Sequence, residues 1–581
     1  MLSSTIRAYQ STLRTFRFEE PKTFSEDFAQ KRYLKKLEEP DPTHAAARAQ
    51  RCWEEWLAHD EGLPQIRLPA GFWYRVRHQL HEVLRAYADG PADLPQGSEF
   101  APTRGNNSCE AKLSASRWTV TYDAFEAFAK IVYNHSGLKR AARQRFTRYC
   151  RINNLNPLDV NFSLYDEVTS SGHEGASIGF ILFSRKLEMI CEFVHGSRFT
   201  TVPKNNEKDR PIEVGPFGNL LVQRSIGNGI RRLLKDVYQV DLDTLADRHR
   251  RVIEHHTRWA TIDLKNASSS IGVSLVEFLF PPWFVRKLMD ARVQGVYGPD
   301  WFYFTKQIGA MGNGFTFELM TLILTAAVKQ LDKAGTVFGD DIIINPSDAP
   351  FLIEMLEEVG FQVNKEKSFI SGPFRESCGA NFHAAEGYIE SYDFEWPESI
   401  GDCVLICNKA YRLARIYPSF QKLYECLLKV TPRALQGGPC LEFAKADLLS
   451  LVGKGFLPGT KSTWEFTLAD ILGQGTPAPI TFPAFFVTPN VRKVRPKADV
   501  LKALTALQYG ANAFYVVRGF EFKSKLRTPV LKHLHPKRHW AKYLMYLDSC
   551  RKAKDVITHK GEWKDVYFIT DGVRVFRARN L

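Results

Sequence analysis

Two adjacent aspartates, Asp340 and Asp341, stand between apolar runs in the segment TVFGDDIIIN, residues 336–345. The apolar residues on both sides predict two short strands around a tight turn, with Gly339, Asp340 and Asp341 at the bend. Two carboxylates this close repel each other, and burying either one without a partner is unfavourable. We therefore expect positive charge, in the form of divalent cations, at this hairpin.

A third carboxylate, Asp263, ends the predicted strand WATIDL at residues 259–264. Between the two segments, MGNGFTFELMTLILTAAVKQL (311–331) predicts a glycine-rich loop followed by a long helix. If the hairpin pairs beside the first strand, Asp263 and Asp340 meet at one sheet edge, with Asp341 as a weaker or indirect ligand. Two Mg²⁺ ions held there could activate an attacking hydroxyl and stabilise a leaving phosphate oxygen, which is the chemistry of nucleotidyl transfer.

Basic residues on either side of these carboxylates suit a triphosphate. The segment TVPKNNEKDRPIEVGP (201–216) holds Lys204, Lys208 and Arg210 at short spacing, and such side chains clamp phosphate groups. After the hairpin, Lys365 or Lys367 in GFQVNKEKSF could protonate the leaving pyrophosphate as a general acid. Solvated basic loops are the ordinary alternative for each of these residues.

The segment MGNGFT (311–316) carries a GxG pattern, which alone is weak evidence for a ligand site. Gly312 and Gly314 allow the backbone to approach a ligand closely. Asn313 and Thr316 offer hydrogen bonds to a ribose or a template.

Charge is unevenly distributed along the 581 residues, whose net charge is +14. Residues 491–581 hold 21 Lys and Arg against 7 Asp and Glu, and basic residues there alternate with aromatic ones. This composition favours a polyanionic partner such as RNA. The longest apolar run contains Glu318 and is too short to span a membrane, so we expect a cytosolic protein without a membrane association.

Six segments occur in an order typical of one family. The chain resembles the replicase subunit of positive-strand RNA bacteriophages, the leviviruses, including the Qβ type, over roughly residues 200–385. The segments resemble that family's polymerase motifs F, A, B, C, D and E, which read here TVPKNNEKDRP, ATIDLKNASSS, MGNGFTFEL, FGDDIII, GFQVNKEKSF and GPFRESCG.

The resemblance implies an α+β fold shaped as a right hand of fingers, palm and thumb, with a ferredoxin-like palm. We expect an N-terminal region with fingers at 1–200, a fingers and palm catalytic core at 201–390, and a thumb with the basic C-terminal region at 391–581. The implied activity is an RNA-directed RNA polymerase that copies a phage genome without a primer, using two Mg²⁺ or Mn²⁺ ions.

The resemblance also assigns roles by motif. It implies metal ligation by Asp263, Asp340 and Asp341, catalysis assisted by Lys367, and support of the growing RNA end by motif E at Arg375. It implies nucleotide binding by the following residues: Lys204, Lys208, Arg210, Ser268, Gly312, Asn313 and Gly314.

The implied partners are single-stranded RNA as template and product, and ribonucleoside triphosphates. The family's replicases also recruit host proteins, which in the Qβ type are the elongation factors EF-Tu and EF-Ts and a ribosomal RNA-binding protein. The implied location is the cytoplasm of the bacterial host.

Two departures from the family pattern stand out. The usual Tyr before Gly-Asp-Asp is Phe338, which keeps the ring and loses the hydroxyl. The last motif A position, often Asp, is Ser269, so sensing of the ribose 2′-OH is left to Asn266, Ser268 or Ser269.

Two rival functions remain. A reverse transcriptase would use the same chemistry, but it usually carries a bulky aromatic after the first Asp, where this chain reads LKNASSS. A non-catalytic basic RNA-binding protein would explain the basic C-terminal region but not the three carboxylates.

Overall fold

The computed structural model describes residues 2–93, 117–170, 178–298, 300–398 and 400–431. Beyond residue 431 it describes short strands, and the rest of the basic C-terminal region lies outside the described residues. These strands are β15 Glu465–Thr467, β16 Pro477–Pro479, β17 Phe486–Val487, β18 Tyr515–Val516, β19 Phe522–Lys523, β20 Leu526–Arg527, β21 Glu562–Trp563, β22 Val566–Thr570 and β23 Arg574–Ala578.

The centre of the molecule is a small antiparallel sheet backed by two helices. Strands β9, β10 and β5 pair in that order, and β6, one residue after β5, pairs with β11. The chain order is strand, helix, two strands, helix and strand, which is the ferredoxin-like arrangement expected of the palm. Its elements are β5 Ala260–Ile262, β6 Leu264–Lys265, α14 Thr316–Leu331, β9 Thr336–Phe338, β10 Asp341–Ile344, α15 Ala349–Glu358 and β11 Gln362–Val363.

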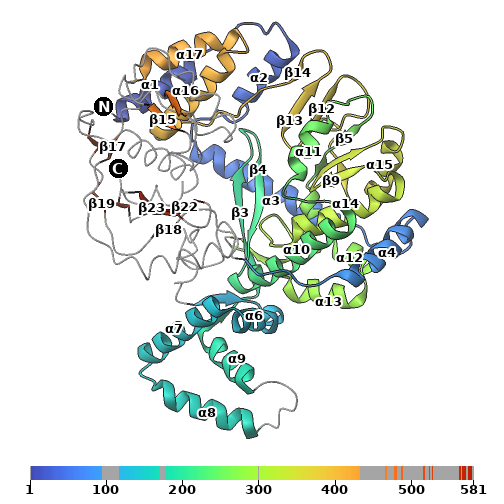
Figure 1. Ribbon diagram of the computed structural model, residues 1–581, viewed down its shortest axis with the longest axis vertical. Coiled ribbons are helices and arrows are strands. Elements are labelled where there is room, and N and C mark those ends of the chain that lie inside the picture. The colour runs from blue at the N-terminus through green and yellow to red at the C-terminus, as the bar shows by residue number, and fades with distance from the viewer. Residues whose placement is uncertain are drawn as a thin grey trace.

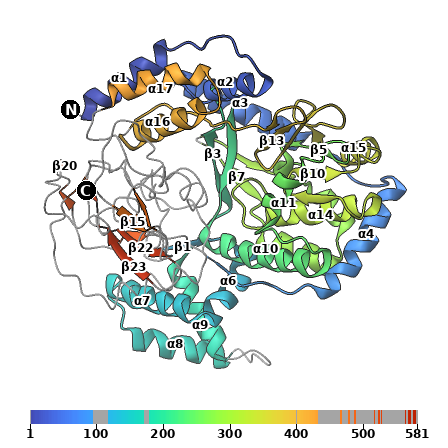
Figure 2. The same ribbon diagram turned by 45° about the horizontal axis from the view of Figure 1, so that its top comes forward.

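Further helices pack around this sheet and share one large core with it. Helix α14 is buried along most of its length, because most of its residues are apolar, and it lies against α10 and α4. Figure 2 shows α10 and α14 side by side in the palm. The surrounding elements are α10 Phe217–Tyr238, α11 Leu245–Val252, η2 Ala267–Ser269, α12 Val273–Leu279 and α13 Pro282–Ala291.

Two more sheets flank the palm. One has the order β4-β3-β7-β8 and carries the motif F segment on the β3–β4 hairpin; the other, β12-β13-β14, carries motif E. Their bounds are β3 Gly196–Pro203, β4 Asp209–Val214, β7 Gly295–Tyr297, β8 Phe302–Phe304, β12 Phe374–Ser377, β13 Ala380–His383 and β14 Gly387–Tyr388.

A helical unit between residues 118 and 193 extends away from the palm, at the bottom of Figure 1. The parallel pair of β1 and β2 joins it to α10. Its elements are β1 Trp118–Val120, α6 Tyr122–Asn134, α7 Ser136–Ile152, α8 Pro157–Ser170, α9 Ile178–Ile190 and β2 Cys191–Phe193.

The two ends of the well-described chain form a second core. Tyr9 and Tyr33 from the N-terminal helices pack with Cys407 and Phe420, and Figures 1 and 2 show α1 and α2 beside α16 and α17. The helices are α1 Leu2–Thr15, α2 Phe24–Leu34, α3 Pro42–Glu61, α4 Gly71–Val83, η1 Leu84–Ala86, α16 Ile400–Ala414 and α17 Ser419–Val430. The domain limits at 200 and 390 stay a prediction. This core joins residues of the first expected region to residues of the third.

None of the described helices combines the length and the hydropathy that crossing a membrane requires. The α+β class and the ferredoxin-like palm follow directly from the order of helices and strands, and both predictions are confirmed.

Candidate active site at the palm hairpin

The predicted hairpin forms, and it pairs beside the strand that leads to Asp263. Ile342 lies opposite Ile262 in the β10–β5 ladder, so the next residues along, Asp341 and Asp263, face each other across the strands. Asp340 occupies the turn, whereas Asp341 is the first residue of β10 and not part of the bend. The three carboxylates therefore meet at one edge of the sheet, as the sequence predicted.

The turn needs glycine at position 339. Gly339 has φ of 63°, a left-handed conformation that costs L-residues energy, and an added Cβ would lie 2.4 Å from the Phe317 ring. Its amide donates a hydrogen bond to the Thr321 hydroxyl at 3.1 Å. The hairpin tip is thereby fixed to helix α14.

Burial and like charge together set the electrostatics of this edge. Burial, followed by the neighbouring Asp340 and Asp263, raises the pKa of Asp341 to about 7. Burial also raises the pKa of Asp263, although Lys367 and Asn364 partly offset this. Two buried carboxylates with raised pKa values, Asp263 and Asp341, beside a third carboxylate form a site that a cation would stabilise.

Three polar residues that sequence reasoning missed hold these carboxylates. The Asn364 amide donates to Asp263 Oδ2 at 2.6 Å, and the Ser368 hydroxyl accepts from the Asp263 amide at 3.1 Å. The Ser377 hydroxyl donates to Asp341 Oδ1 at 3.4 Å. Nothing in their local sequence marks them, because the β6–β11 ladder and the motif E sheet bring them here from positions far along the chain.

The residues at this edge suit metal ions in their chemistry but are not gathered as closely as a metal site requires. In the described part of the chain, no group of three or more His, Cys, Asp or Glu side chains is gathered closely enough to hold a metal ion. The donor set itself suits Mg²⁺, which prefers carboxylate oxygens, and the raised pKa values of Asp263 and Asp341 favour a cation.

Cations of motifs F and D reach the same edge. The surrounding protein lowers the pKa of Lys204, and Arg210 and Lys367 lower it further, while Asp263 raises it. Lys204 therefore interacts electrostatically with both Asp263 and Lys367, although it lies on the separate β3–β4 hairpin. Lys208 and Arg210 sit on that hairpin with exposed side chains.

Of the two motif D lysines, only Lys367 is placed beside the carboxylates. Its ammonium lies 3.1 Å from Glu376 Oε1. Burial lowers its pKa, but Glu376 and Asp263 outweigh burial and raise that pKa above its ordinary value. Lys365 is exposed. Lys367 is therefore protonated and near the reaction edge, as a general acid must be.

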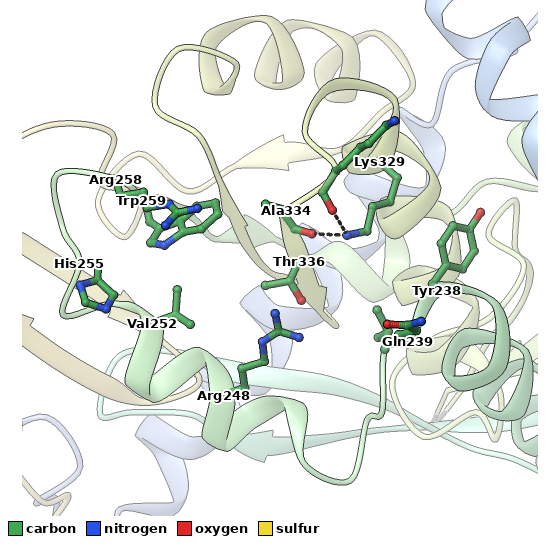
Figure 3. A pocket seen from close by; sticks show the side chains of 13 residues that line it. Tyr238, Gln239, Arg248, Val252, His255, Arg258, Trp259, Lys329, Ala334 and Thr336 are labelled. Carbon is green, nitrogen blue, oxygen red and sulfur yellow. Dashed lines mark hydrogen bonds between the residues drawn. The ribbon is translucent and has the colours of Figure 1, made fainter.

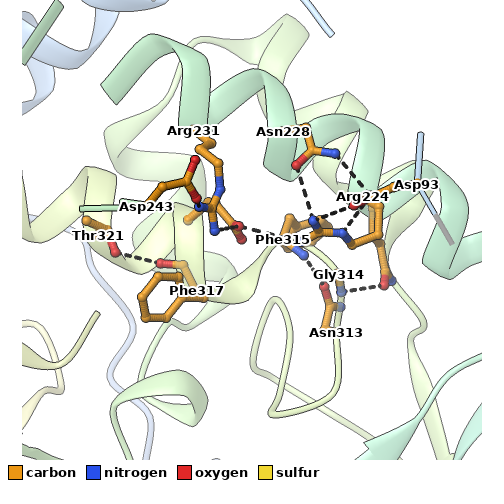
Figure 4. A network of polar contacts seen from close by, with 12 residues as sticks. Asp93, Arg224, Asn228, Arg231, Asp243, Asn313, Gly314, Phe315, Phe317 and Thr321 are labelled. Atoms are coloured by element: carbon orange, nitrogen blue, oxygen red, sulfur yellow. Dashed lines mark hydrogen bonds and ion pairs between the residues drawn. The ribbon is translucent and has the colours of Figure 1, made fainter. Parts of the chain in front are cut away.

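The motif B loop is anchored from behind by helix α10 (Figure 4). The Gly314 amide donates to Gln223 Oε1 at 3.0 Å. An added Cβ at Gly314 would meet Gln223 Cβ at 2.9 Å, and one at Gly227 would meet the Gly314 carbonyl at 2.7 Å. Both glycines therefore allow the loop and the helix to touch.

Glu318, the charged residue in the apolar motif B helix, is 2% exposed and pairs with two arginines of α10. Arg231 lies 3.1 Å and Arg224 3.5 Å from Glu318 Oε1. Arg224 also holds Asp93, and Arg231 holds Asp243 (Figure 4). A buried carboxylate with two cationic partners fixes the helix that follows the loop.

The remaining motif B residues serve the loop itself. The Asn313 side-chain oxygen accepts a hydrogen bond from the Phe315 amide at 3.1 Å. Gly312 has φ of 108°, and a Cβ there would lie 2.4 Å from the Glu213 carbonyl. Thr316 is 3% exposed, so its hydroxyl is not offered to a ligand in this arrangement. The roles of Gly312, Asn313 and Gly314 in nucleotide binding stay predictions.

Arg375 does not face the solvent where RNA would pass. It is 2% exposed, and its guanidinium donates to six backbone carbonyl groups, those of Trp259, His256, Ile370, Ser371, Gly372 and Phe374. Its contribution to motif E is to brace the segment before β5 against β12. Direct support of the RNA end by this side chain is inconsistent with that burial.

The motif A hydroxyls differ in exposure. Ser269 is 4% exposed, Ser268 is half-buried and Asn266 is exposed, with a left-handed backbone. Of the three, Ser268 and Asn266 are the ones a ribose could reach. The assignment of Ser268 to nucleotide binding stays a prediction.

Comparison with known proteins places these motifs in one family. Residues 176–452 match the family model RNA replicase, beta-chain. The RNA-directed RNA polymerase subunit beta of Qbeta virus (strain MX1) is 37% identical over 256 residues, 41% of this chain and 43% of that protein. The RNA-directed RNA polymerase beta chain of Escherichia phage MS2 is 40% identical over 230 residues, 37% of this chain and 41% of that one.

The chain spans less than half the length of these curated relatives. Among solved structures, the RNA-dependent RNA polymerase from bacteriophage phi12 is 12% identical, with a TM-score of 0.37 over 73% of this chain and 76% of that one, a likeness too low to add weight. The resemblance to the phage replicase family is confirmed over residues 176–452, the segment that holds all six motifs.

Proposed function

We propose that this chain is an RNA-directed RNA polymerase that replicates a positive-strand RNA phage genome by primer-independent nucleotidyl transfer. The observation that carries the proposal is the β5–β10–β9 register, which puts Asp263 opposite Asp341 with Asp340 in the adjoining turn. Two cations from other motifs, Lys204 of motif F and Lys367 of motif D, interact electrostatically with these carboxylates. The matched replicase relatives support the same activity.

Two Mg²⁺ ions, for which Mn²⁺ can substitute, would be held by Asp263 and Asp340, with Asp341 assisting. When bound, they would supply charge neutralisation for the attacking hydroxyl and the departing phosphate oxygen. Lys204, Lys208 and Arg210 bind and orient the triphosphate through their positive charge. Lys367 donates its proton to the leaving pyrophosphate, for which its raised pKa keeps it charged.

The finer expectations belong to the same proposal. The substrates are single-stranded RNA and ribonucleoside triphosphates, and the site of action is the cytoplasm of the bacterial host. Host partners are EF-Tu, EF-Ts and a ribosomal RNA-binding protein, as the family resemblance implies. The basic segment from 491 to 581 offers positive charge for RNA or for these partners.

The test is incorporation of labelled nucleotides on a single-stranded RNA template, by the purified chain and by the chain with host-cell extract. We expect ribonucleotides and not deoxyribonucleotides to be incorporated, and only with Mg²⁺ or Mn²⁺. Copying with deoxyribonucleotides alone would identify a reverse transcriptase. RNA binding without incorporation under every condition would favour the RNA-binding protein.

A further inference from the structure

A cavity of about 480 Å³ opens at the end of the catalytic hairpin that is remote from its turn (Figure 3). Thr336, the first residue of β9, forms part of its wall. The other walls come from the end of α10, from α11, from the turn before β5 and from the end of α14. None of the three catalytic carboxylates lines it, so it is separate from the active site.

The lining of this cavity is basic. It contains Arg248, His255, Arg258, Lys329 and Lys333, and no Asp or Glu is among the lining residues. Across the described ranges, Arg248, Arg258 and Lys333 make no ion pair with a carboxylate. Positive charge has thus been gathered from three separate elements, and no carboxylate lines the cavity itself.

Lys329 is the cation of this lining whose ammonium group is held in place by the protein. Its ammonium donates to the carbonyl groups of Lys333 at 2.6 Å and Gly335 at 2.8 Å, which hold it at the cavity wall (Figure 3). Burial lowers its pKa, Asp332 opposes this by raising the pKa, and Arg248 makes a smaller contribution that lowers it. An anion in the cavity would add to the negative charge that Asp332 supplies beside these two cations.

We propose that this cavity binds a phosphate group. Two guanidinium groups and two ammonium groups match phosphate oxygens in charge and hydrogen bonding. The volume is that of a site for a small ligand, large enough for a phosphate with the adjoining sugar. The phosphate belongs to a single-stranded RNA or to a free nucleotide or pyrophosphate, and the RNA source rests on the proposed function.

The test compares the full chain with an Arg248→Gln/Lys333→Gln double variant and with Arg251→Gln, a control on the same helix whose side chain does not line the cavity. Binding of fluorescent oligouridylate is measured against salt by anisotropy, and binding of pyrophosphate by calorimetry without metal. Poly-glutamate serves as a non-phosphate anion. Because the substituted side chains are exposed, the variants should fold normally, which a urea titration checks.

If RNA is the source, the salt slope of RNA binding falls by about 0.7 for each phosphate that the double variant no longer neutralises, and the control keeps the wild-type slope. If free phosphate is the source, pyrophosphate affinity falls while the RNA slope is unchanged. Equal RNA and pyrophosphate binding in all three proteins overturns the proposal. A loss confined to poly-glutamate also overturns it and indicates an acidic protein partner.

A second and independent observation concerns His249, which is 0% exposed on α11. Its Nδ1 lies 3.0 Å from the Ser377 hydroxyl and its Nε2 lies 3.3 Å from the Thr336 hydroxyl. Ser377 in turn donates to Asp341 at 3.4 Å. A chain of hydrogen bonds therefore leads from β9 through His249 to a catalytic carboxylate.

When Asp341 is ionised, as it must be to ligate a metal ion, this acceptor at the end of the chain fixes the direction of every bond. Because Ser377 donates its proton to Asp341, its oxygen accepts from His249 Nδ1–H, and Nε2 must accept from Thr336. Burial lowers the pKa of His249 to about 3, so the neutral imidazole needed for this arrangement is the stable form. The geometry points to His249 as a positioning residue that orients Asp341 through Ser377, a role that rests on the proposed function.

Metal binding without substrate tests this role, because Mn²⁺ affinity can be read by electron paramagnetic resonance in the absence of nucleotides. We expect His249→Leu and Ser377→Ala each to weaken Mn²⁺ binding about tenfold, as removal of such supporting hydrogen bonds does elsewhere. His249→Gln, which keeps a donor and an acceptor, should restore part of it. His256→Leu, outside the hydrogen-bond chain, is the matched control.

Ser377→Ala keeps the test decisive if His249→Leu folds poorly. In incorporation assays the two variants should lower kcat and leave KM for the ribonucleotide nearly unchanged. Wild-type Mn²⁺ affinity in both variants would overturn the positioning role while the proposed function stands. A wild type that binds Mn²⁺ through this chain but incorporates no nucleotide would overturn the proposed function and leave the positioning role in place.

Discussion

Replacing Asp341 by Asn should make the metal-free protein more stable at high pH, although the residue belongs to the proposed active site. Burial and the neighbouring Asp340 raise the pKa of Asp341 to about 7. The unfolded chain has this pKa near its ordinary value of about 4. Between these values the folded state binds more protons than the unfolded state, so stability falls as the pH rises from about 4 to about 7.

The size of the effect follows from the two pKa values. Each tenfold change in the ionisation constant corresponds to about 1.4 kcal/mol, so the ionised Asp341 costs the fold up to about 4 kcal/mol above pH 7. Asn is close in shape, carries no charge and can still accept from Ser377. At pH 8 the Asp341→Asn variant should therefore exceed the wild type by several kcal/mol, and at pH 4 the two should be nearly equal.

Urea unfolding of both proteins at pH 4 and pH 8, in the presence of a chelator, measures this difference. Added Mg²⁺ should then stabilise the wild type more than the variant, because ligands stabilise the state that binds them. A variant that is no more stable than the wild type at pH 8, relative to pH 4, would refute the claim that burial beside other carboxylates makes the ionised Asp341 unfavourable to the fold.

Three further substitutions test the supports of the site. Arg375→Lys should lower the free energy of unfolding by about 3 kcal/mol or more, since a lysine leaves several buried carbonyl groups without donors; urea unfolding that matches the wild type would show the brace to be dispensable. Glu318→Gln should cost about 1 to 3 kcal/mol, because the two part-buried guanidinium groups lose the buried carboxylate that they share and keep only Asp93 and Asp243, and it should lower nucleotide incorporation; unchanged values of both would contradict its role. Gly339→Ala should both strain the turn and collide with Phe317. Gly379 also has a left-handed backbone but lies in open space, so Gly379→Ala should cost only about 1 kcal/mol. Equal thermal shifts in the two variants would rule out the collision.

Local pattern was sufficient to predict the β9–β10 hairpin that carries Asp340 and Asp341. The apolar runs around Gly339 and Asp340 set the two strands, and the strand before Asp263 had the same signature. Since the side-chain period of a strand is two residues, one pairing then placed all three carboxylates. The ferredoxin-like palm followed from the family resemblance and the order of its elements.

The supports of the carboxylates could not be predicted, because they arrive by pairings between distant segments. Asn364 and Ser377 are ordinary polar residues until the β6–β11 ladder and the motif E sheet bring them to Asp263 and Asp341. Burial was equally invisible in the sequence: Arg375 was expected near RNA, yet its side chain is enclosed by carbonyl groups. The same holds for the N-terminal helices, whose apolar faces gave no indication that α16 and α17 cover them.

The central claim is that the carboxylates at the palm hairpin perform ribonucleotide transfer. The most direct measurement is incorporation of labelled ribonucleotides on single-stranded RNA with Mg²⁺, comparing wild type, Asp340→Ala and Glu354→Ala, an exposed acid on α15 as control. We expect incorporation by the wild type and the control and none by Asp340→Ala, with host-cell extract added if the chain alone is silent. Equal incorporation by all three proteins would contradict the claim that this hairpin is the catalytic centre.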